Sequence, residues 1–264
     1  MKKIILTSAA VILATSAAQA VGIKPYISNK LSYSFLNQTD SASIYWNVDD
    51  GRLETQFFHN EMDGVLGNKL AVGVAFPIDA IHGAIRTELE WGINTKAKIK
   101  NESYKSKKEQ FGVVTWEGWA PAIEDFEIKT STYFFNAYYD FNTGTAWTPY
   151  IGIGAGLATL DLKSNYLSLW GAPMPHSWGD TVIGKGNANN FAWNIGLGIA
   201  FAIDDNFAID LGYRYARLGD VKANVMGYFG GTPNPGWGDD GEWGQYSKAT
   251  VSMHDIMLGV RYAF

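Results

Sequence analysis

Hydrophobic and polar residues alternate along several stretches of this chain. Near its end, Ile256, Leu258, Val260, Tyr262 and Phe264 occupy every second position. This spacing places the five side chains on one face of a β-strand and the intervening residues on the other face. An apolar outer face with polar residues behind it suits a strand that meets lipid acyl tails. The pattern therefore predicts a membrane-embedded β-barrel.

The same alternation predicts eight antiparallel strands in an up-and-down transmembrane barrel. Their expected ranges are 22–36, 66–78, 83–99, 126–141, 147–163, 190–203, 206–222 and 248–264. The connections alternate in length, with short ones at 79–82, 142–146 and 204–205 and long ones at 37–65, 100–125, 164–189 and 223–247. Asp, Asn and Gly residues mark the short connections as turns. Short periplasmic turns and four long external loops are typical of bacterial outer-membrane barrels.

The predicted outer face contains no charged side chain. Its 45 positions hold no Asp, Glu, Lys or Arg, although the 18% charged content of the chain predicts about eight. A basic residue at the bilayer midplane costs roughly 2–4 kcal/mol, which explains this depletion. Asn29 is the one residue on this face whose polar side chain does not suit contact with lipid.

The inward positions carry a nearly balanced set of charges. An eight-stranded barrel is just wide enough for its own side chains, so buried charges must pair or keep water. We therefore expect an ion-pair network in the lumen, formed by Arg86, Arg214 and Arg261 with Glu88, Glu90 and Asp210. A charged ion-conducting pore is the alternative.

The first twenty residues resemble a cleaved secretory signal peptide. Lys2 and Lys3 precede a short apolar run over residues 4–14, and small residues follow at 18–20. The barrel domain is expected over residues 21–264. The 14% aromatic content suits a barrel with interfacial girdles, whereas the net charge of −5 does not favour nucleic-acid binding. The absence of cysteine rules out disulfides and thiol chemistry.

The four histidines give little support for catalysis. His254 and Asp255 are adjacent on a strand and should point to opposite faces, so they cannot act as a dyad. His82 lies in a predicted periplasmic turn, and His59 and His176 lie in predicted external loops. We expect no catalytic, cofactor or metal site, with a lipid A acylase or deacylase at the rim as the alternative.

Aromatic and basic residues gather in the predicted external segments. Lys96, Lys98 and Lys100 continue the inward parity of Arg86, so we expect them at the barrel mouth, with binding of lipopolysaccharide phosphates as the alternative. Exposed Trp is typical of binding hot spots, whereas packing between loops is the alternative role. The loop tryptophans are Trp46, Trp116, Trp119, Trp170, Trp178, Trp237 and Trp243.

Three segments resemble the opacity-protein-like family of small outer-membrane barrels. They are residues 148–156 (TPYIGIGAG), 208–215 (AIDLGYRY) and 258–264 (LGVRYAF). The resemblance implies that the terminal aromatic residue, Phe264, helps the barrel-assembly machinery to recognise the chain. It also implies adhesion or host contact through the loops.

These observations favour a non-enzymatic, monomeric surface protein in the outer membrane of a Gram-negative bacterium. Its expected partners are outer-membrane lipid, lipopolysaccharide, the assembly machinery and host or cell-surface molecules. A structural envelope barrel or narrow pore is the second hypothesis, and the lipid-modifying enzyme is the third.

Overall fold

The protein is all-β in the regions that its computed structural model describes. These regions are residues 23–47, 51–78, 82–119, 122–168, 182–226, 228–229, 232–233 and 243–264. Each regular element in them is a strand. Within these regions no helix is long and apolar enough to cross a membrane. The predicted signal peptide lies outside the described residues.

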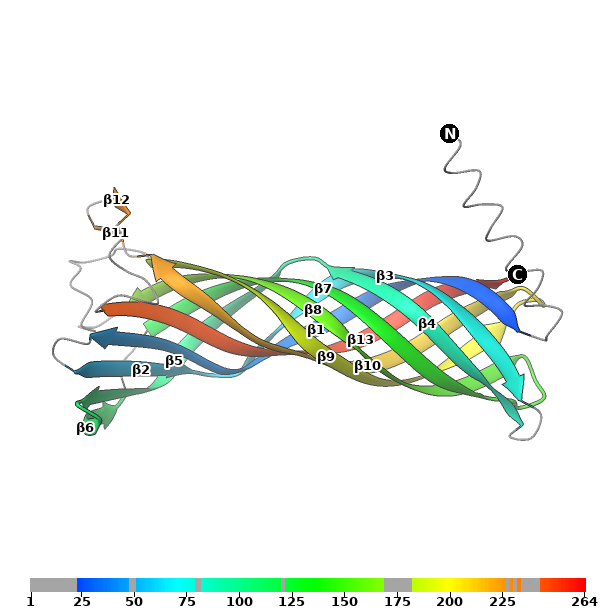
Figure 1. The fold of residues 1–264 in the computed structure, drawn as a ribbon, viewed down its shortest axis with the longest axis horizontal. Helices are drawn as coiled ribbons and strands as arrows, with labels where there is room; N and C mark the ends of the chain where they lie inside the picture. The colour runs from blue at the N-terminus through cyan, green and yellow to red at the C-terminus, as the bar shows by residue number, and fades with distance from the viewer. Residues whose placement is uncertain are drawn as a thin grey trace.

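Eight antiparallel strands form a closed barrel (Figure 1). They are β1 (Lys24–Asn47), β3 (Glu61–Ile78), β4 (Gly83–Asn94), β7 (Ala122–Phe141), β8 (Trp147–Ser168), β9 (Val182–Ala202), β10 (Phe207–Met226) and β13 (Trp243–Ala263). Neighbours in sequence are neighbours in the sheet, and β13 pairs with β1 from Tyr26↔Ala263 onward. The predicted eight-stranded up-and-down barrel is therefore confirmed.

Two further strands rebuild the barrel wall at the end opposite the C-terminus. They are β2 (Arg52–Phe58) and β5 (Ala97–Gln110), seen at the left of Figure 1. β1 pairs with β3 as far as Gln38 and with β2 from Ala42 onward, while β5 replaces β4 beside β7. A hairpin strand, β6 (Val113–Gly118), pairs with the outer end of β5. A separate two-stranded sheet joins β11 (Tyr228–Phe229) to β12 (Thr232–Pro233).

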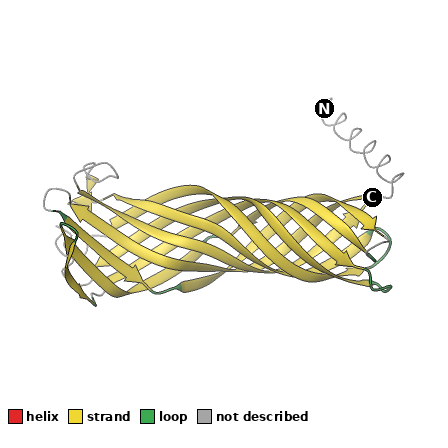
Figure 2. Ribbon diagram, turned by 60° about the horizontal axis from the view of Figure 1, so that its bottom comes forward, coloured by secondary structure: helices red, strands yellow, loops and turns green. Residues whose placement is uncertain are grey.

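Much of the predicted external loop sequence is strand instead. The segments 37–65 and 100–125 contain the end of β1, all of β2 and β6, and most of β5. Figure 2 shows that the strands run almost the whole length of the molecule. The first two long connections are therefore built largely from β-strands that extend beyond the membrane. Parts of the other two predicted loops, 169–181 and 234–242, lie outside the described residues.

The strands reverse their amphipathic pattern part-way along their length. On β7, Tyr133 and Phe135 are exposed on the outer face, whereas further along Ile128 and Phe126 are buried inside. Outer positions there carry charge instead, as at Glu127. An apolar exterior is stable in lipid, and an apolar interior with a charged exterior is stable in water. The reversal therefore marks the level at which the wall leaves the bilayer.

The tight turns at the C-terminal end are formed by the residues that predict them. The Asp204 carboxylate accepts hydrogen bonds from the backbone N–H groups of Asn206, at 2.8 Å, and Phe207, at 2.7 Å. In the turn before β8, Gly144 has a φ of 70° and donates its N–H to Asn142 Oδ1 at 3.0 Å. Glycine tolerates this left-handed conformation without a steric cost. Both turns are short, as expected for the periplasmic side.

Candidate functional site: lumen and outer rim

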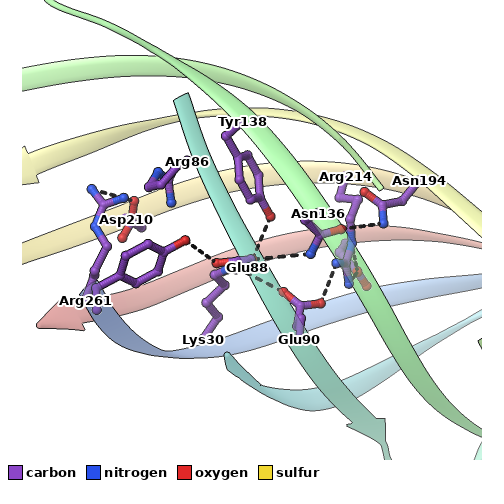
Figure 3. A network of polar contacts seen from close by, with 12 residues as sticks. Lys30, Arg86, Glu88, Glu90, Asn136, Tyr138, Asn194, Asp210, Arg214 and Arg261 are labelled. Atoms are coloured by element: carbon purple, nitrogen blue, oxygen red, sulfur yellow. Dashed lines mark hydrogen bonds and ion pairs between the residues drawn. The ribbon is translucent and has the colours of Figure 1, made fainter. Parts of the chain in front are cut away.

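A buried ion-pair network fills the periplasmic half of the lumen (Figure 3). At its centre Arg214 Nη1 contacts Glu90 Oε1 at 2.6 Å, and Arg214 Nη2 contacts Asp255 Oδ2 at 2.7 Å. Lys69 Nζ lies 3.3 Å from the same Asp255 oxygen and donates a hydrogen bond to Ser32 Oγ at 2.7 Å. A guanidinium with its donors on two carboxylates is held in one orientation.

Glu88 links this centre to the aromatic residues of the lumen. Its Oε1 accepts hydrogen bonds from Lys30 Nζ at 2.7 Å and from the Tyr138 hydroxyl at 2.8 Å. Its Oε2 accepts one from the Tyr26 hydroxyl at 3.1 Å. Lys30 also reaches Glu90 at 3.1 Å, so the two carboxylates share one cation. Hydrogen bonding on this scale offsets the cost of burying the charges.

A second group of charges lies toward the periplasmic end. Arg86 makes a bidentate contact with Asp140, through Nε at 2.8 Å and Nη2 at 3.0 Å. Its guanidinium also lies 4.5 Å from the centre of the Tyr138 ring, which allows a cation–π contact. Arg261 Nη2 lies 3.7 Å from Asp210 Oδ1, the longest ion-pair distance among the described residues of the lumen.

The structure places all six predicted network residues in the lumen, and two of the three arginines pair within the predicted set. Arg214 meets Glu90, and Arg261 approaches Asp210. Arg86 instead pairs with Asp140. Lys69 and Asp255 complete the network, and both lie at inward positions of the predicted strands 66–78 and 248–264. The prediction omits them because the two faces of these strands were compared only from Leu70 and Ile256 onward.

Inward glycines make room for the large lumen side chains. A Cβ on Gly152 would lie 2.2 Å from Tyr138 Cδ1, and one on Gly198 would lie 2.4 Å from the Tyr150 hydroxyl. The glycine-rich run on β8 therefore leaves space for Tyr138 beside Gly152 and for Asn136 beside Gly154. It is followed by strand rather than by a helix, so it is not a phosphate-binding loop.

An apolar layer closes the lumen above the ion pairs. It is built from β1, β3, β5, β7, β8, β9, β10 and β13, and its largest side chains are almost fully buried. These are Leu36, Phe126, Ile128, Phe134, Leu160, Leu162, Leu218 and Met253. An ion that crossed this level would lose its hydration among apolar side chains, which is costly.

A second polar compartment lies beyond the apolar layer, at the level where the outer face is already charged. Glu124 is fully buried there, and its Oε1 accepts hydrogen bonds from the hydroxyls of Ser164 and Ser247. Within the described part of the chain, its Oε2 has no hydrogen-bond partner. Asn101, directly opposite on β5, is also buried and unpartnered there. Burial raises the pKa of the Glu124 carboxyl to about 7.

The described histidines do not form a catalytic arrangement with each other. The His59 ring lies 4.9 Å from the Tyr104 ring, and His82 is exposed in its turn with a φ of 50°. His254 points outward and shares a 2.7 Å hydrogen bond with the Tyr213 hydroxyl, while its neighbour Asp255 points into the lumen. Among the residues with described positions, no three His, Cys, Asp or Glu side chains are grouped as metal ligands. His176 lies outside the described residues.

The predicted loop tryptophans have different locations. Trp116 lies on β6 and Trp119 just after it, and both are exposed. Trp46 and Trp243 lie on β1 and β13, in neighbouring register positions. The remaining three, Trp170, Trp178 and Trp237, lie outside the described residues.

The lysines at the start of β5 do not face the barrel mouth. Lys98 has a side-chain exposure of 75% and points outward, whereas Ala97 and Ile99 are buried. The expectation of inward lysines is wrong because the chain changes parity between Asn94, the end of β4, and Ala97. Because two residues rather than one lie between the inward positions Asn94 and Ala97, the side chains from Ala97 to Ser103 point to the face opposite to the one predicted.

A family match agrees with this geometry. Residues 6–228 match the family described as outer membrane protein beta-barrel domain. The chain belongs to this family. The membership confirms the resemblance to small outer-membrane barrels and places the protein in the outer membrane of a Gram-negative cell.

The sequences of two relatives align with most of this outer-membrane barrel. Outer membrane protein PagN of Salmonella typhimurium is 29% identical over 201 residues, which cover 76% of this chain and 74% of PagN. An uncharacterised protein of Brucella abortus is 23% identical over 258 residues, 90% of this chain and 84% of the relative. Among solved structures, neisserial surface protein A aligns with a TM-score of 0.43 and 14% identity, covering 91% of this chain and 97% of that one.

Polar side chains on the lipid-facing surface of the barrel satisfy each other. Asn29 Nδ2 donates to Asn68 Oδ1 at 3.1 Å, and Asn68 Nδ2 donates back to Asn29 Oδ1 at 3.2 Å. Unsatisfied amides are costly in hydrocarbon, so the reciprocal pair explains why Asn29 is tolerated there.

Proposed function

We propose that this barrel is a non-enzymatic surface protein whose extracellular rim contacts host molecules or other cells. The β5–β6 hairpin carries the proposal. β6 exposes apolar side chains along its length, beyond the level at which the wall leaves the membrane. The exposed fractions of Phe111, Val113 and Trp119 are 75%, 66% and 68%. Large exposed apolar groups in water are typical of protein interaction sites.

The hairpin is anchored firmly enough to present these groups. The Phe111 N–H donates a 2.8 Å hydrogen bond to the Gly51 carbonyl in the turn between β1 and β2. A Cβ on Gly51 would lie 2.4 Å from Phe111 Cδ1, so the ring packs onto the bare glycine backbone. At the base, Lys105 and Glu117 form a 2.7 Å ion pair across the two strands. A pre-ordered hairpin loses little entropy when a partner binds.

Two other functions have less support. The apolar layer of the lumen argues against the narrow pore, because ions would have to cross it without water. A lipid-modifying enzyme at the rim would use a histidine beside an activating group; of the two predicted rim histidines, His59 packs against the Tyr104 ring, and His176 lies outside the described residues.

Cell binding by hairpin variants tests the proposal. Bacteria displaying Phe111→Ser/Trp119→Ser should bind host epithelial cells at least about tenfold less than those displaying wild type. Thr159→Ala/Asn189→Ala is the control, since these two side chains form a 2.8 Å hydrogen bond with each other on the outer face of β8 and β9. Equal binding by wild type and the hairpin variant, at equal surface levels, removes the proposal.

A further inference from the structure

Two pairs of like charges face each other on the outer wall of the barrel. Lys163 of β8 lies directly opposite Lys185 of β9, and Lys222 of β10 lies directly opposite Lys248 of β13. Asn224, two residues beyond Lys222, pairs with Lys185, so the two pairs occupy adjacent positions on the same wall. All four lysines are exposed. We refer to these four residues as the lysine face.

The lysine face lacks the acidic partners that other outer lysines have. On β5, Lys105 and Lys107 form ion pairs with Glu117 and Glu109 at 2.7 and 2.6 Å. No ion pair joins any member of the lysine face to another residue in the described ranges. Like charges directly opposite each other destabilise a sheet. An external anion that contacts such a pair would reduce this repulsion.

The described acidic groups near the lysine face make their close contacts with other residues. Asp161 accepts a 2.5 Å hydrogen bond from Asn187 Nδ2, and Asp220 accepts a 2.7 Å bond from Thr250 Oγ1. Glu127, opposite Lys163 on β7, forms its ion pairs with Lys96 and Lys98. Lys222 Nζ lies 4.8 Å from the centre of the Tyr246 ring, an attractive contact that leaves its charge in place.

The position of the lysine face on the wall indicates the source of the anion. The outer aromatic girdle passes through Trp193, Tyr215 and His254, whose rings are in contact at 5.6 and 5.1 Å. Arg217, the next outward residue on β10, is exposed and forms no ion pair within the described ranges. Lys222 follows Arg217 by five residues, which places the lysine face roughly 10–15 Å above Arg217 and roughly 15–20 Å above the girdle. Phosphorylated sugars of the outer leaflet occupy this level.

We propose that the lysine face and Arg217 form a binding site for the phosphate groups of lipopolysaccharide. Arg217 meets phosphates at the membrane surface, and the lysines meet those of the sugars above it. Ammonium groups bind phosphate as point charges and tolerate the irregular spacing of such a ligand. The site lies on the side wall of the barrel and is independent of the adhesive hairpin.

Binding of purified lipopolysaccharide to the full barrel in detergent micelles tests the site. The variant Lys163→Gln/Lys185→Gln/Lys222→Gln/Lys248→Gln should bind at least about tenfold more weakly than wild type at low ionic strength. Dephosphorylated lipopolysaccharide should bind wild type as weakly as the intact ligand binds the variant. The control is Lys105→Gln/Lys107→Gln/Lys108→Gln, which removes three charges from ion-paired positions on β5 without releasing Glu127, and it should bind as wild type does.

Three outcomes overturn the site: equal binding by wild type and the lysine-face variant, an equal loss in the control, or binding of heparin without lipopolysaccharide. The last would assign the lysines to sulfated glycans. Thermal unfolding provides a second readout that does not need the quadruple variant. Added inorganic pyrophosphate should raise the unfolding temperature of wild type, and this rise should be smaller in Lys185→Gln/Lys248→Gln. An identical rise in both proteins contradicts the site.

Discussion

Arg214 holds the lumen network together because it bridges two carboxylates that come from different strands. Glu90 on β4 and Asp255 on β13 contact separate nitrogen atoms of its guanidinium, at 2.6 and 2.7 Å. Lysine could not replace it, since a single ammonium lacks the planar set of donors. The residue therefore joins strands that are not neighbours in the sheet.

Replacing Arg214 by Met should destabilise the barrel by about 3–5 kcal/mol, because Glu90 and Asp255 would keep buried charges without their main partner. Urea unfolding in lipid vesicles measures the change. Arg261→Met is the control, since its contact with Asp210 is 3.7 Å long and the residue is less enclosed. A loss at Arg214 no greater than that at Arg261 contradicts this account.

Glu124 should make stability depend on pH in the opposite sense to a paired carboxylate. Its pKa is raised from 4.5 to about 7 on folding, so the folded state holds a proton that the unfolded state releases. The free energy of unfolding should therefore fall as the pH rises from about 4.5 to 7 and stay lower above that range. Glu124→Gln should abolish this contribution and be more stable than wild type at pH 8. Parallel pH profiles for the two proteins would refute the prediction.

Parity along each strand predicts which residues enter the lumen, but not which of them pair. Arg86 was expected to meet Glu88, Glu90 or Asp210, and it takes Asp140 from the adjacent strand instead. Partners depend on the stagger between strands and on which side chains bend across the lumen. The alternation of residues within one strand determines neither of these features.

At the level of whole strands, alternation located all eight spans but ended them too early. The prediction looked for strands with apolar residues outside and polar residues inside. Beyond the membrane the strands have polar residues outside and apolar residues inside. Ile99 inside and Lys98 outside on β5 illustrate this reversal. A search for either phase of alternation would have extended several strands. The change of parity before Ala97 could not be predicted from the sequence, because it depends on how residues 95–96 pack against β3. There the N–H of Thr95 donates a 2.8 Å hydrogen bond to the Leu66 carbonyl.

Deletions at this junction should obey the parity rule. Removing both Thr95 and Lys96 would make the side chains of Lys98 and Lys100 point inward, toward the apolar layer. The barrel should then fail to assemble. Removing Lys96 alone keeps Ala97 inward and should leave most of the protein folded. The fraction that migrates as compact barrel on unheated gels measures both outcomes. Equal assembly of the two deletions would disprove the role given to the junction.

The molecule as a whole should not conduct ions. The apolar layer spans the lumen, so wild-type barrel in planar bilayers should give no stable unit openings. Phe126→Ser/Leu160→Ser/Leu218→Ser, which hydrates that layer, should give openings if it assembles, and bilayers without protein provide the baseline. Reproducible unit steps from wild type would show that the seal opens.

Assembly of the whole barrel should depend on Phe264, whose ring packs edge-on against Tyr262 at 5.2 Å. Phe264→Ser should reduce the amount of folded barrel in the outer membrane several-fold, if the assembly machinery reads this aromatic residue. Refolding of the purified variant into vesicles should change little and serves as the control. Undiminished surface levels would exclude the role.

The length of the strands decides what the rim can touch. A span of 20 to 24 residues rises roughly 50–60 Å at the tilt of such barrels, and the apolar band accounts for only about 25 Å of it. The remainder is a stiff stalk, since its wall is a continuous hydrogen-bonded sheet with a packed centre. Shortened carbohydrate coats would leave the tip well clear of the cell, whereas long polysaccharide chains would bury it. The same protein should therefore be an accessible ligand on rough cells and a concealed one on smooth cells.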